Sequence, residues 1–260
     1  MSSSAPCAFA RPVSSRLILP RQIWPRTALL ALLAVTSVAA TGCLPGSLLG
    51  IGGDSGGSSY TPDYSAKAPA HRTGLPCADS DPTHLCVAVK VVSYQDSAGR
   101  PILSQAQAQA NLSGVNQLWS QCHVQFTLES YQAVAASSFG LPYSPTEQDA
   151  LADVRSTFEN SDTLLVTATG QWSGTLGAGA ANAWTELPAT GPFGVVMEAS
   201  VSSVSGLLAH ELGHYLDLQH TSDVYNVMNP TVFANSINII DSQCSTARAT
   251  AISFWGAALR

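Results

Sequence analysis

Two histidines and a glutamate lie within five consecutive residues, His210, Glu211 and His214. The mostly apolar stretch before them, Ser205-Gly-Leu-Leu-Ala209, indicates the end of a buried helix. Residues four apart on an α-helix are separated by only about 40° of rotation and about 6 Å of rise. His210 and His214 can therefore offer imidazole nitrogens to one metal ion. Glu211 is turned away by about 100°, so its expected role is to act as a general base on a water at that ion.

A third ligand must come from further along the chain, because catalytic zinc takes three protein ligands and keeps one position open. No glutamate follows Glu211, and only one histidine, His220, follows His214. The remaining carboxylates are Asp217, Asp223 and Asp241. On a continued helix Asp217 would lie about 10 Å from His210, too far to share its ion. His220 is therefore the best candidate, provided that the helix ends and the chain turns back after His214.

A methionine in an Asn/Pro-rich turn follows, within Tyr225-Asn-Val-Met228-Asn-Pro230. The whole set, HExxHxxxxxH and then this methionine, resembles the metzincin clan of zinc endopeptidases, whose pattern is HExxHxxGxxH with a downstream Met-turn. The resemblance implies that Met228 lies beneath the metal, that Glu211 is the catalytic base, and that the zinc ligands are His210, His214 and His220. It also implies hydrolysis of peptide bonds in a protein or peptide substrate, with Zn2+ as the cofactor.

The sequence departs from that family pattern at Asp217, which stands where the family has glycine. In the family the chain leaves the helix at this position in a left-handed conformation. Asp and Asn are the non-glycine residues that tolerate positive φ best. We therefore expect the turn to form at modest cost and the metal site to persist.

Composition favours one globular domain with a targeting segment. The 260 residues carry a net charge of −6, with 11% charged and 45% hydrophobic residues. No basic run is present that would bind nucleic acid. Separately, we expect the protein to be a monomer. Two alternatives to a peptidase remain: a non-catalytic, surface-anchored zinc-binding module, and a zinc hydrolase acting on a non-protein substrate.

Residues 1–42 have the features of a secretory signal. An apolar run, Ala28–Val35, follows a segment whose charged residues are Arg11, Arg16, Arg21 and Arg26. The small residues Ala40-Thr-Gly42 precede Cys43, which resembles the end of a bacterial lipoprotein signal. We therefore expect Cys43 to be lipidated and the exported protein to be anchored to a membrane of the cell envelope. The alternative is cleavage near Ala39 or Ala40 and release of a soluble protein.

A Gly/Ser-rich stretch makes residues 43–75 a flexible tether, which leaves 76–260 as the folded domain. That domain contains four cysteines, and export to an oxidising compartment predicts two disulfides with three possible pairings. We favour Cys77–Cys86 as a local link and Cys122–Cys244 as a link between the first and last helices. A further possibility is that Cys77 ligates the zinc as a latency switch.

Strands and helices alternate along this domain, which predicts an α/β (α+β) fold: a twisted mixed sheet with an active-site helix and a C-terminal helix. The order is similar to that of the metzincin catalytic domain. Residues 178–184 are the candidate edge strand above the cleft, or alternatively a Gly/Ala loop. Thr146 is the candidate cap of the second helix, and Ile252, Phe254 and Trp255 are expected to face inward. The expected strands are 86–94, 124–131, 163–168, 178–184 and 194–199, and the expected helices are 102–122, 146–158, 203–216 and 241–259.

Overall fold

The structure is a computed structural model that describes residues 83–178, 182–189 and 191–260. The predicted signal, the tether and the first residues of the predicted domain lie outside these ranges. In the described part of the chain, no helix combines the length and apolarity that a membrane span requires. The elements are, in order, β1 (Leu85–Tyr94), α1 (Gln105–Trp119), β2 (Val124–Val134), α2 (Gln148–Phe158), β3 (Leu164–Thr169), α3 (Gly174–Ala178), β4 (Ala183–Thr185), β5 (Val195–Glu198), α4 (Ser205–Tyr215) and α5 (Asp241–Ser253), with 3-10 turns at Ser120–Cys122, Ala136–Phe139 and Gly256–Ala258.

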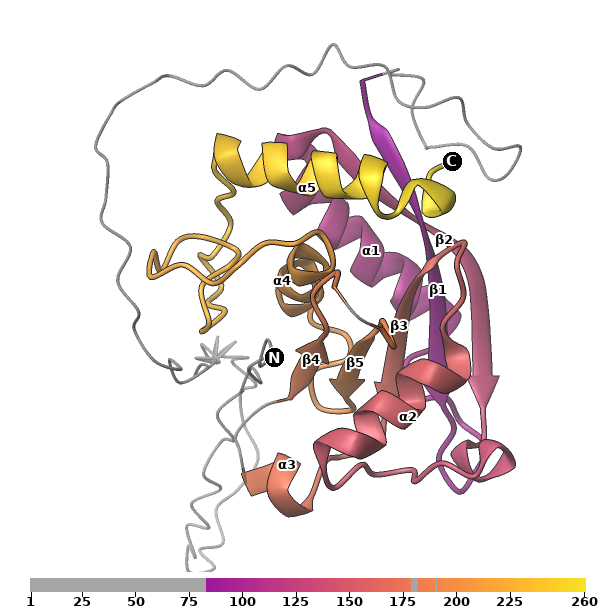
Figure 1. The fold of residues 1–260 in the computed structure, drawn as a ribbon. Coiled ribbons are helices and arrows are strands. Elements are labelled where there is room, and N and C mark those ends of the chain that lie inside the picture. The colour runs from indigo at the N-terminus through magenta and orange to yellow at the C-terminus, as the bar shows by residue number, and fades with distance from the viewer. Residues whose placement is uncertain (1–82, 179–181, 190) are drawn as a thin grey trace, which may run out of the picture.

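One mixed sheet organises these elements, in the strand order β2-β1-β3-β5-β4. The first four of these strands run parallel, and β4 pairs antiparallel with β5 at one edge. Figure 1 shows the strands side by side, with α2 in front of them and α1 and α4 behind. The mixed α/β sheet that the sequence predicts is therefore confirmed.

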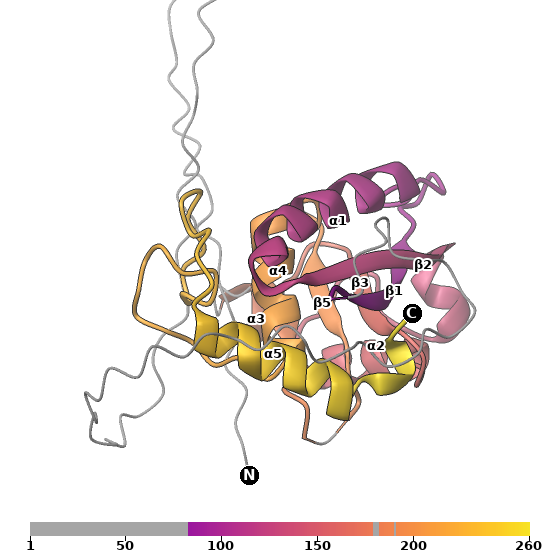
Figure 2. The ribbon, with the colours of Figure 1, turned by 90° about the horizontal axis from the view of Figure 1, so that it is seen from above.

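Apolar residues alternate between two cores because successive strand residues point to opposite faces of a sheet. In β3, Leu164 and Val166 belong to the larger core, which α1, α4 and α5 cover, whereas Leu165 belongs to the smaller core under α2. All six residues of β3 are buried, as expected for a strand covered on both faces. The view from above in Figure 2 shows α1 and α2 on opposite sides of the sheet.

The predicted helices are present with shorter boundaries. α1 begins after Ser104, whose side chain forms a reciprocal capping box with Gln107. α2 begins at Gln148 without a side-chain cap, so the prediction of Thr146 as its cap is wrong. The Thr146 carbonyl instead accepts hydrogen bonds from the Leu176 amide and the Thr175 hydroxyl.

Two further predictions need correction. The edge strand expected over 178–184 is observed at Ala183–Thr185, and residue 178 belongs to the short helix α3, Gly174–Ala178. The C-terminal helix ends at Ser253 instead of reaching 259. Ile252, within α5, and Phe254, directly after it, are both exposed, so of the three residues expected to face inward only Trp255 is buried.

One disulfide joins Cys122, in the 3-10 turn before β2, to Cys244 in the first turn of α5. It confirms the predicted link between the first and last helical regions. Cys86 lies buried near the start of β1. Its expected partner Cys77 lies outside the described residues, as does Cys43, so the Cys77–Cys86 pairing, the latency switch and lipidation remain predictions.

Candidate metal centre

Helix α4 carries the first two histidines and is buried on most sides. Its described neighbours are α1, β4 and β5. The Trp119 indole of α1 donates a hydrogen bond of 3.2 Å to the Ala209 carbonyl, one residue before His210. This contact ties the helix to α1 at the start of the HExxH segment.

The end of α4 is set by Asp217, whose φ of 66° is left-handed, as the sequence predicts. The Asp217 amide donates to the His214 carbonyl at 3.0 Å, and the Leu218 amide donates to the Gly213 carbonyl at 2.9 Å. These two bonds form a Schellman motif, the usual helix ending around a left-handed residue. The chain therefore turns back after the helix, as the third histidine requires.

The turn brings the three imidazoles together. The Nε2 atom of His214 lies 3.1 Å from that of His210 and 3.1 Å from that of His220, and the remaining Nε2 pair is 3.3 Å apart. Tetrahedral zinc with Zn–N distances of about 2.0–2.1 Å requires nitrogens about 3.3 Å apart. The spacing of the three nitrogens therefore fits one small metal ion.

Hydrogen bonds at the other ring nitrogens fix the tautomers of two of these histidines. His210 Nδ1 lies 2.7 Å from the Val227 carbonyl, and His214 Nδ1 lies 2.8 Å from the Leu218 carbonyl. Because a carbonyl only accepts, each Nδ1 carries the proton and each Nε2 presents a lone pair. Lone pairs that converge at about 3 Å repel one another unless a cation lies between them, so the donor set fits a metal such as zinc.

Burial keeps these rings neutral. It lowers the pKa of His210 to about 3, and the charge of His220 adds to the effect. Burial also holds the pKa of His214 well below its ordinary value, with smaller contributions from His210 and His220. Both rings are therefore neutral near pH 7, which is the form that binds a metal.

Met228 lies directly beneath the helix, and the backbone beside it orients the ligands. The Val227 carbonyl accepts from His210, and the Met228 carbonyl accepts from the amide of Thr221, the residue after His220. A Cβ atom added to Gly213 would lie 2.3 Å from the Met228 sulfur. The methionine can therefore pack there only because position 213 is glycine.

Asn226 supports this turn and is a residue that the sequence analysis missed. Its Oδ1 accepts from the Met228 amide at 2.8 Å, and its side chain forms two hydrogen bonds with Gln243 in the first turn of α5. Gln243 is adjacent to the disulfide residue Cys244. An Asn two residues before a turn methionine is the available sequence signal, because Asn side chains commonly bond the backbone two residues on.

Glu211 is buried, with 1% of its surface exposed. Its Oε2 accepts a 2.6 Å hydrogen bond from the hydroxyl of Thr185 in β4. No spacing rule links positions 185 and 211, so this partner could not be inferred from the sequence. The structure thus places the sequence-predicted base between the metal-binding helix and the edge strand.

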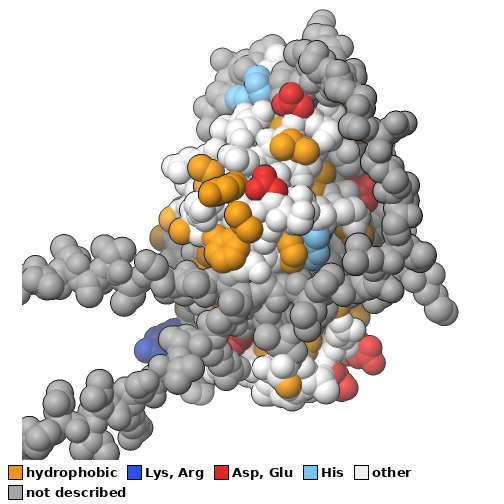
Figure 3. All heavy atoms as spheres, turned by 90° about the vertical axis from the view of Figure 1, so that its left-hand side faces the viewer, with side chains coloured by type: hydrophobic (Ala, Val, Ile, Leu, Met, Phe, Trp, Pro, Cys, Tyr) orange, Lys and Arg blue, Asp and Glu red, His pale blue; other side chains and the backbone are white. Residues whose placement is uncertain are grey.

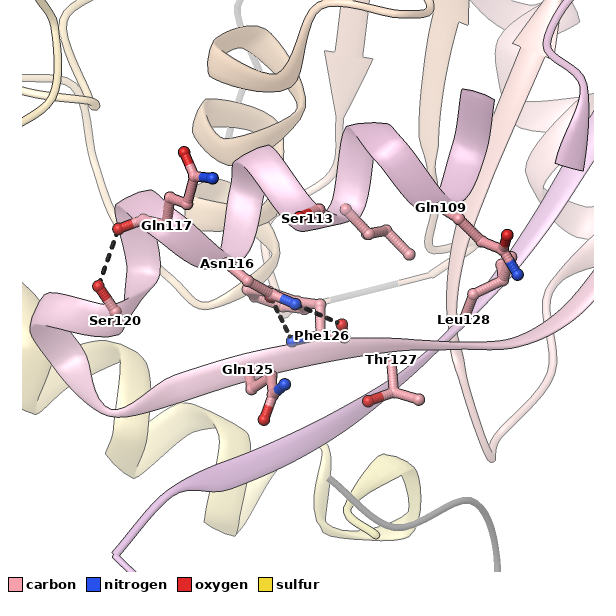
Figure 4. A pocket seen from close by; sticks show the side chains of 10 residues that line it. Gln109, Ser113, Asn116, Gln117, Ser120, Gln125, Phe126, Thr127 and Leu128 are labelled. Atoms are coloured by element: carbon pink, nitrogen blue, oxygen red, sulfur yellow. Dashed lines mark hydrogen bonds between the residues drawn. The ribbon is translucent and has the colours of Figure 1, made fainter. Parts of the chain in front are cut away.

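A separate groove of about 670 Å³ lies between α1 and β2. Figure 4 shows Asn116 reaching from α1 to the backbone of Phe126, and no charged residue lines the groove. The polar side chains along it include Gln109, Ser113, Gln117, Ser120, Gln125 and Thr127. None of the three histidines belongs to it, so the groove is distinct from the metal centre.

Exposed apolar side chains lie in the segment between His220 and α5. Val224, Tyr225, Ile237 and Ile240 are each 45–54% exposed. The backbone amides of Ile237 and Asn238 donate to the Tyr225 carbonyl, which holds the two stretches together. Figure 3, which views the side where this segment lies in Figure 1, shows hydrophobic side chains gathered on that face together with histidine.

Comparison with known proteins finds solved structures that resemble this chain at low sequence identity. No protein-family model matches the chain, and no curated protein matches it. A structure described as that of a chaperone-substrate complex has 13% identity and a TM-score of 0.45, over 67% of this chain and 38% of that chain. Metalloproteinase-II from Bacteroides fragilis has 14% identity and a TM-score of 0.42, over 66% of this chain and 53% of that one. This chain therefore spans less than two thirds of either protein.

Proposed function

We propose that this protein is a zinc-dependent endopeptidase of the metzincin type. The observation that carries the proposal is the convergence of three Nε2 atoms, 3.1–3.3 Å apart, beside a glutamate from the same helix. Three nitrogen ligands with one position left for a water or substrate constitute the usual arrangement of catalytic zinc.

The residues of the site have different roles in the proposed hydrolysis. His210, His214 and His220 would hold the ion through Nε2, and a bound zinc would supply an acidified water and a Lewis acid for the scissile carbonyl. The Glu211 carboxylate takes the proton from the attacking water and delivers it to the leaving amine. The Val227 and Leu218 carbonyls keep His210 and His214 in the ligating tautomer.

Two features support a peptide as the substrate. β4 forms one edge of the sheet and contacts the helix that carries Glu211, and an extended peptide can add to a sheet edge as a further strand. The exposed apolar side chains of 224–240 offer contact area for apolar side chains of an unfolded substrate.

We also propose that the mature protein begins at Cys43 and is held at a membrane by lipid on that residue. The small residues before Cys43 and the Gly/Ser-rich stretch after it support this. Mass spectrometry of the amino-terminal peptide from the membrane fraction tests it. An unmodified peptide that begins near residue 40, from a soluble fraction, would instead favour release of the protein.

Digestion of a peptide library by the purified protein tests the activity. Cleavage should occur with zinc, stop with a chelator and return when zinc is restored. Glu211→Gln should keep one zinc per chain and lose activity by about 10³-fold or more, since general acid–base catalysis supplies 10²–10⁴-fold. Glu147→Gln is the matched control, because Glu147 is an exposed residue at the start of α2.

A protein that binds zinc but cleaves no member of the library would contradict the endopeptidase. If metal removal also unfolded it, the result would favour the zinc-binding module. Unchanged hydrolysis by Glu211→Gln would refute the role given to that carboxylate.

A further inference from the structure

We propose that Thr185 is a positioning residue whose hydroxyl holds the Glu211 carboxylate in its working orientation. The effect on catalysis rests on the function proposed above, because Glu211 acts as a base only within it. The orientation of the carboxylate does not depend on that function and can be measured separately. No residue of β4 belongs to the metal-binding motif, so the edge strand has a role of its own in the site.

The contact itself is short and buried. The Thr185 hydroxyl donates to Glu211 Oε2 at 2.6 Å, in the range of a charge-assisted O–H···O⁻ bond. Thr185 is 7% exposed and Glu211 is 1% exposed, so water has little access to the bond. A buried carboxylate needs hydrogen-bond donors to offset its desolvation, and Thr185 supplies one from outside the helix.

The strand that carries Thr185 is anchored at both ends. Before it, the Asn182 amide bonds the carboxylate of Glu198 at the end of β5. After it, Glu186 forms a 3.2 Å ion pair with the buried Arg155 of α2. Between these anchors Thr185 lies opposite Val195 in the antiparallel β4–β5 pair. The Thr185 backbone is thus fixed by contacts with α2 and β5, independently of α4.

The side-chain types explain why such a donor is useful. Glutamate has three rotatable side-chain bonds, and fixing its rotamers costs side-chain entropy. Threonine is β-branched and therefore stiff at χ1, so its hydroxyl is held on a defined vector from the strand. The flexible carboxylate is fixed by a rigid partner on a strand that is itself anchored.

This assignment predicts a specific pattern of kinetic effects. Thr185→Val has nearly the same shape but no hydroxyl, so it should lower kcat by about 10- to 100-fold, the usual cost of losing a hydrogen-bond partner behind a functional group. KM and zinc content should change by less than about twofold, because the metal ligands are unchanged and an added strand pairs with the backbone of β4, which Thr185→Val retains. Thr185→Ser keeps the hydroxyl and should restore most of kcat.

Thr167→Val is the matched control. Thr167 is a fully buried sheet threonine of β3, and its hydroxyl has no hydrogen-bond partner among the described residues. Its strand neighbours, Val92 and Val196, belong to the core under α2, on the other face of the sheet. This substitution makes the same chemical change in a buried strand but should leave kcat unchanged.

The experiment combines kcat and KM for the wild type and the three variants, zinc content by elemental analysis, and crystal structures of the zinc-loaded wild type and Thr185→Val. The proposal is supported if kcat falls in Thr185→Val alone and the Glu211 carboxylate turns away while the three imidazoles stay in place. It is overturned if Glu211 keeps its place in Thr185→Val, if Thr185→Ser is as slow as Thr185→Val, or if zinc is lost in proportion to activity. A wild type that cleaves nothing removes the proposed function, yet the two crystal structures still decide whether Thr185 orients Glu211.

Discussion

The two outermost strands of the sheet, β2 and β4, each meet a helix through a polar side chain, but the two contacts satisfy different groups. At the β2 edge, Asn116 of α1 donates to the Phe126 carbonyl at 3.0 Å and accepts from the Phe126 amide at 2.8 Å. At the β4 edge, the Thr185 side chain donates to a carboxylate of α4. The first contact completes the backbone pairing of an edge strand; the second orients an acidic side chain.

Because of this difference, we expect the β2 edge to contribute to the stability of the fold and the β4 edge to contribute to activity. An unpaired strand edge is a template for unwanted pairing, and Asn116 uses both atoms of its amide to cover the β2 edge at Phe126. The groove beside it is lined by uncharged residues. The β4 edge lies next to the helix that carries the histidines. Changes at β4 should therefore alter reaction rate, whereas changes at β2 should alter folding.

The largest effect is expected at the metal centre. His220→Ala should weaken zinc binding by at least about a hundredfold, because even the loss of an outer hydrogen-bond partner costs 10- to 100-fold. Elemental analysis after dialysis and peptide hydrolysis should fall together. His84→Ala is the control, since His84 lies outside the cluster. Full zinc content in His220→Ala would show that the ligand set is wrong.

The largest effect on stability is expected at the disulfide that lies just before β2. Replacing both Cys122 and Cys244 with Ser removes a cross-link between residues 122 positions apart in the sequence and should lower the free energy of unfolding by about 4 kcal/mol. Denaturant titration measures this change. Activity per folded molecule should persist. If catalysis fell while stability did not, the division between the two edges would be incorrect.

A smaller effect is expected at Asn116. Asn116→Ala leaves the Phe126 amide and carbonyl without their side-chain partner and should cost about 2 kcal/mol of unfolding free energy. Asn116→Asp retains the acceptor for the amide and should lose only part of this stability. Thermal unfolding and kcat should be measured for both. A kcat reduced as much as in Thr185→Val would contradict the comparison.

The smallest effect concerns the turn between the ligands. Asp217→Gly relieves a left-handed conformation but increases the freedom of the unfolded chain, so stability should change by no more than about 1 kcal/mol. Asp217→Ala puts a residue that tolerates positive φ less well than Asp at a φ of 66° and should be less stable than the wild type. Both variants should retain zinc. Loss of zinc from Asp217→Gly would show that the Asp side chain itself is needed.

The features of this protein that depend on local residue spacing could be predicted from its sequence. The histidines, the left-handed Asp217 and the mixed sheet follow from helical periodicity, φ preferences and the alternation of elements. Thr185, Asn226 and the requirement for Gly213 were missed, because these depend on contacts between distant segments. A glycine inside a helix, which costs about 1 kcal/mol relative to alanine, was the one available hint of the methionine beneath it.

The predicted ends of the helices and strands were wrong where tertiary contacts override the local sequence pattern. Residue 178, expected to begin the edge strand, instead ends the short helix α3. The apolar Ile252 and Phe254 were expected inside, but Ile252 lies on an exposed face of α5 and Phe254 is exposed directly after the helix ends at Ser253. The apolar character of a residue near a helix end does not by itself determine whether its side chain faces the core, because the exact end of a helix is hard to predict.

The segment from Gly213 to His220 combines the helix ending, a ligand pair and the carbonyl that orients one ring within eight consecutive residues. Such a unit is suited to transplantation: grafted onto the end of another helix, it should bring along His214, His220 and the Leu218 carbonyl. It would not bring the carbonyl for His210 or the methionine floor, which come from Val227 and Met228. A designer would therefore obtain only a weak two-histidine site from the short unit, and a rigid three-histidine site only by including the chain from His210 to Met228.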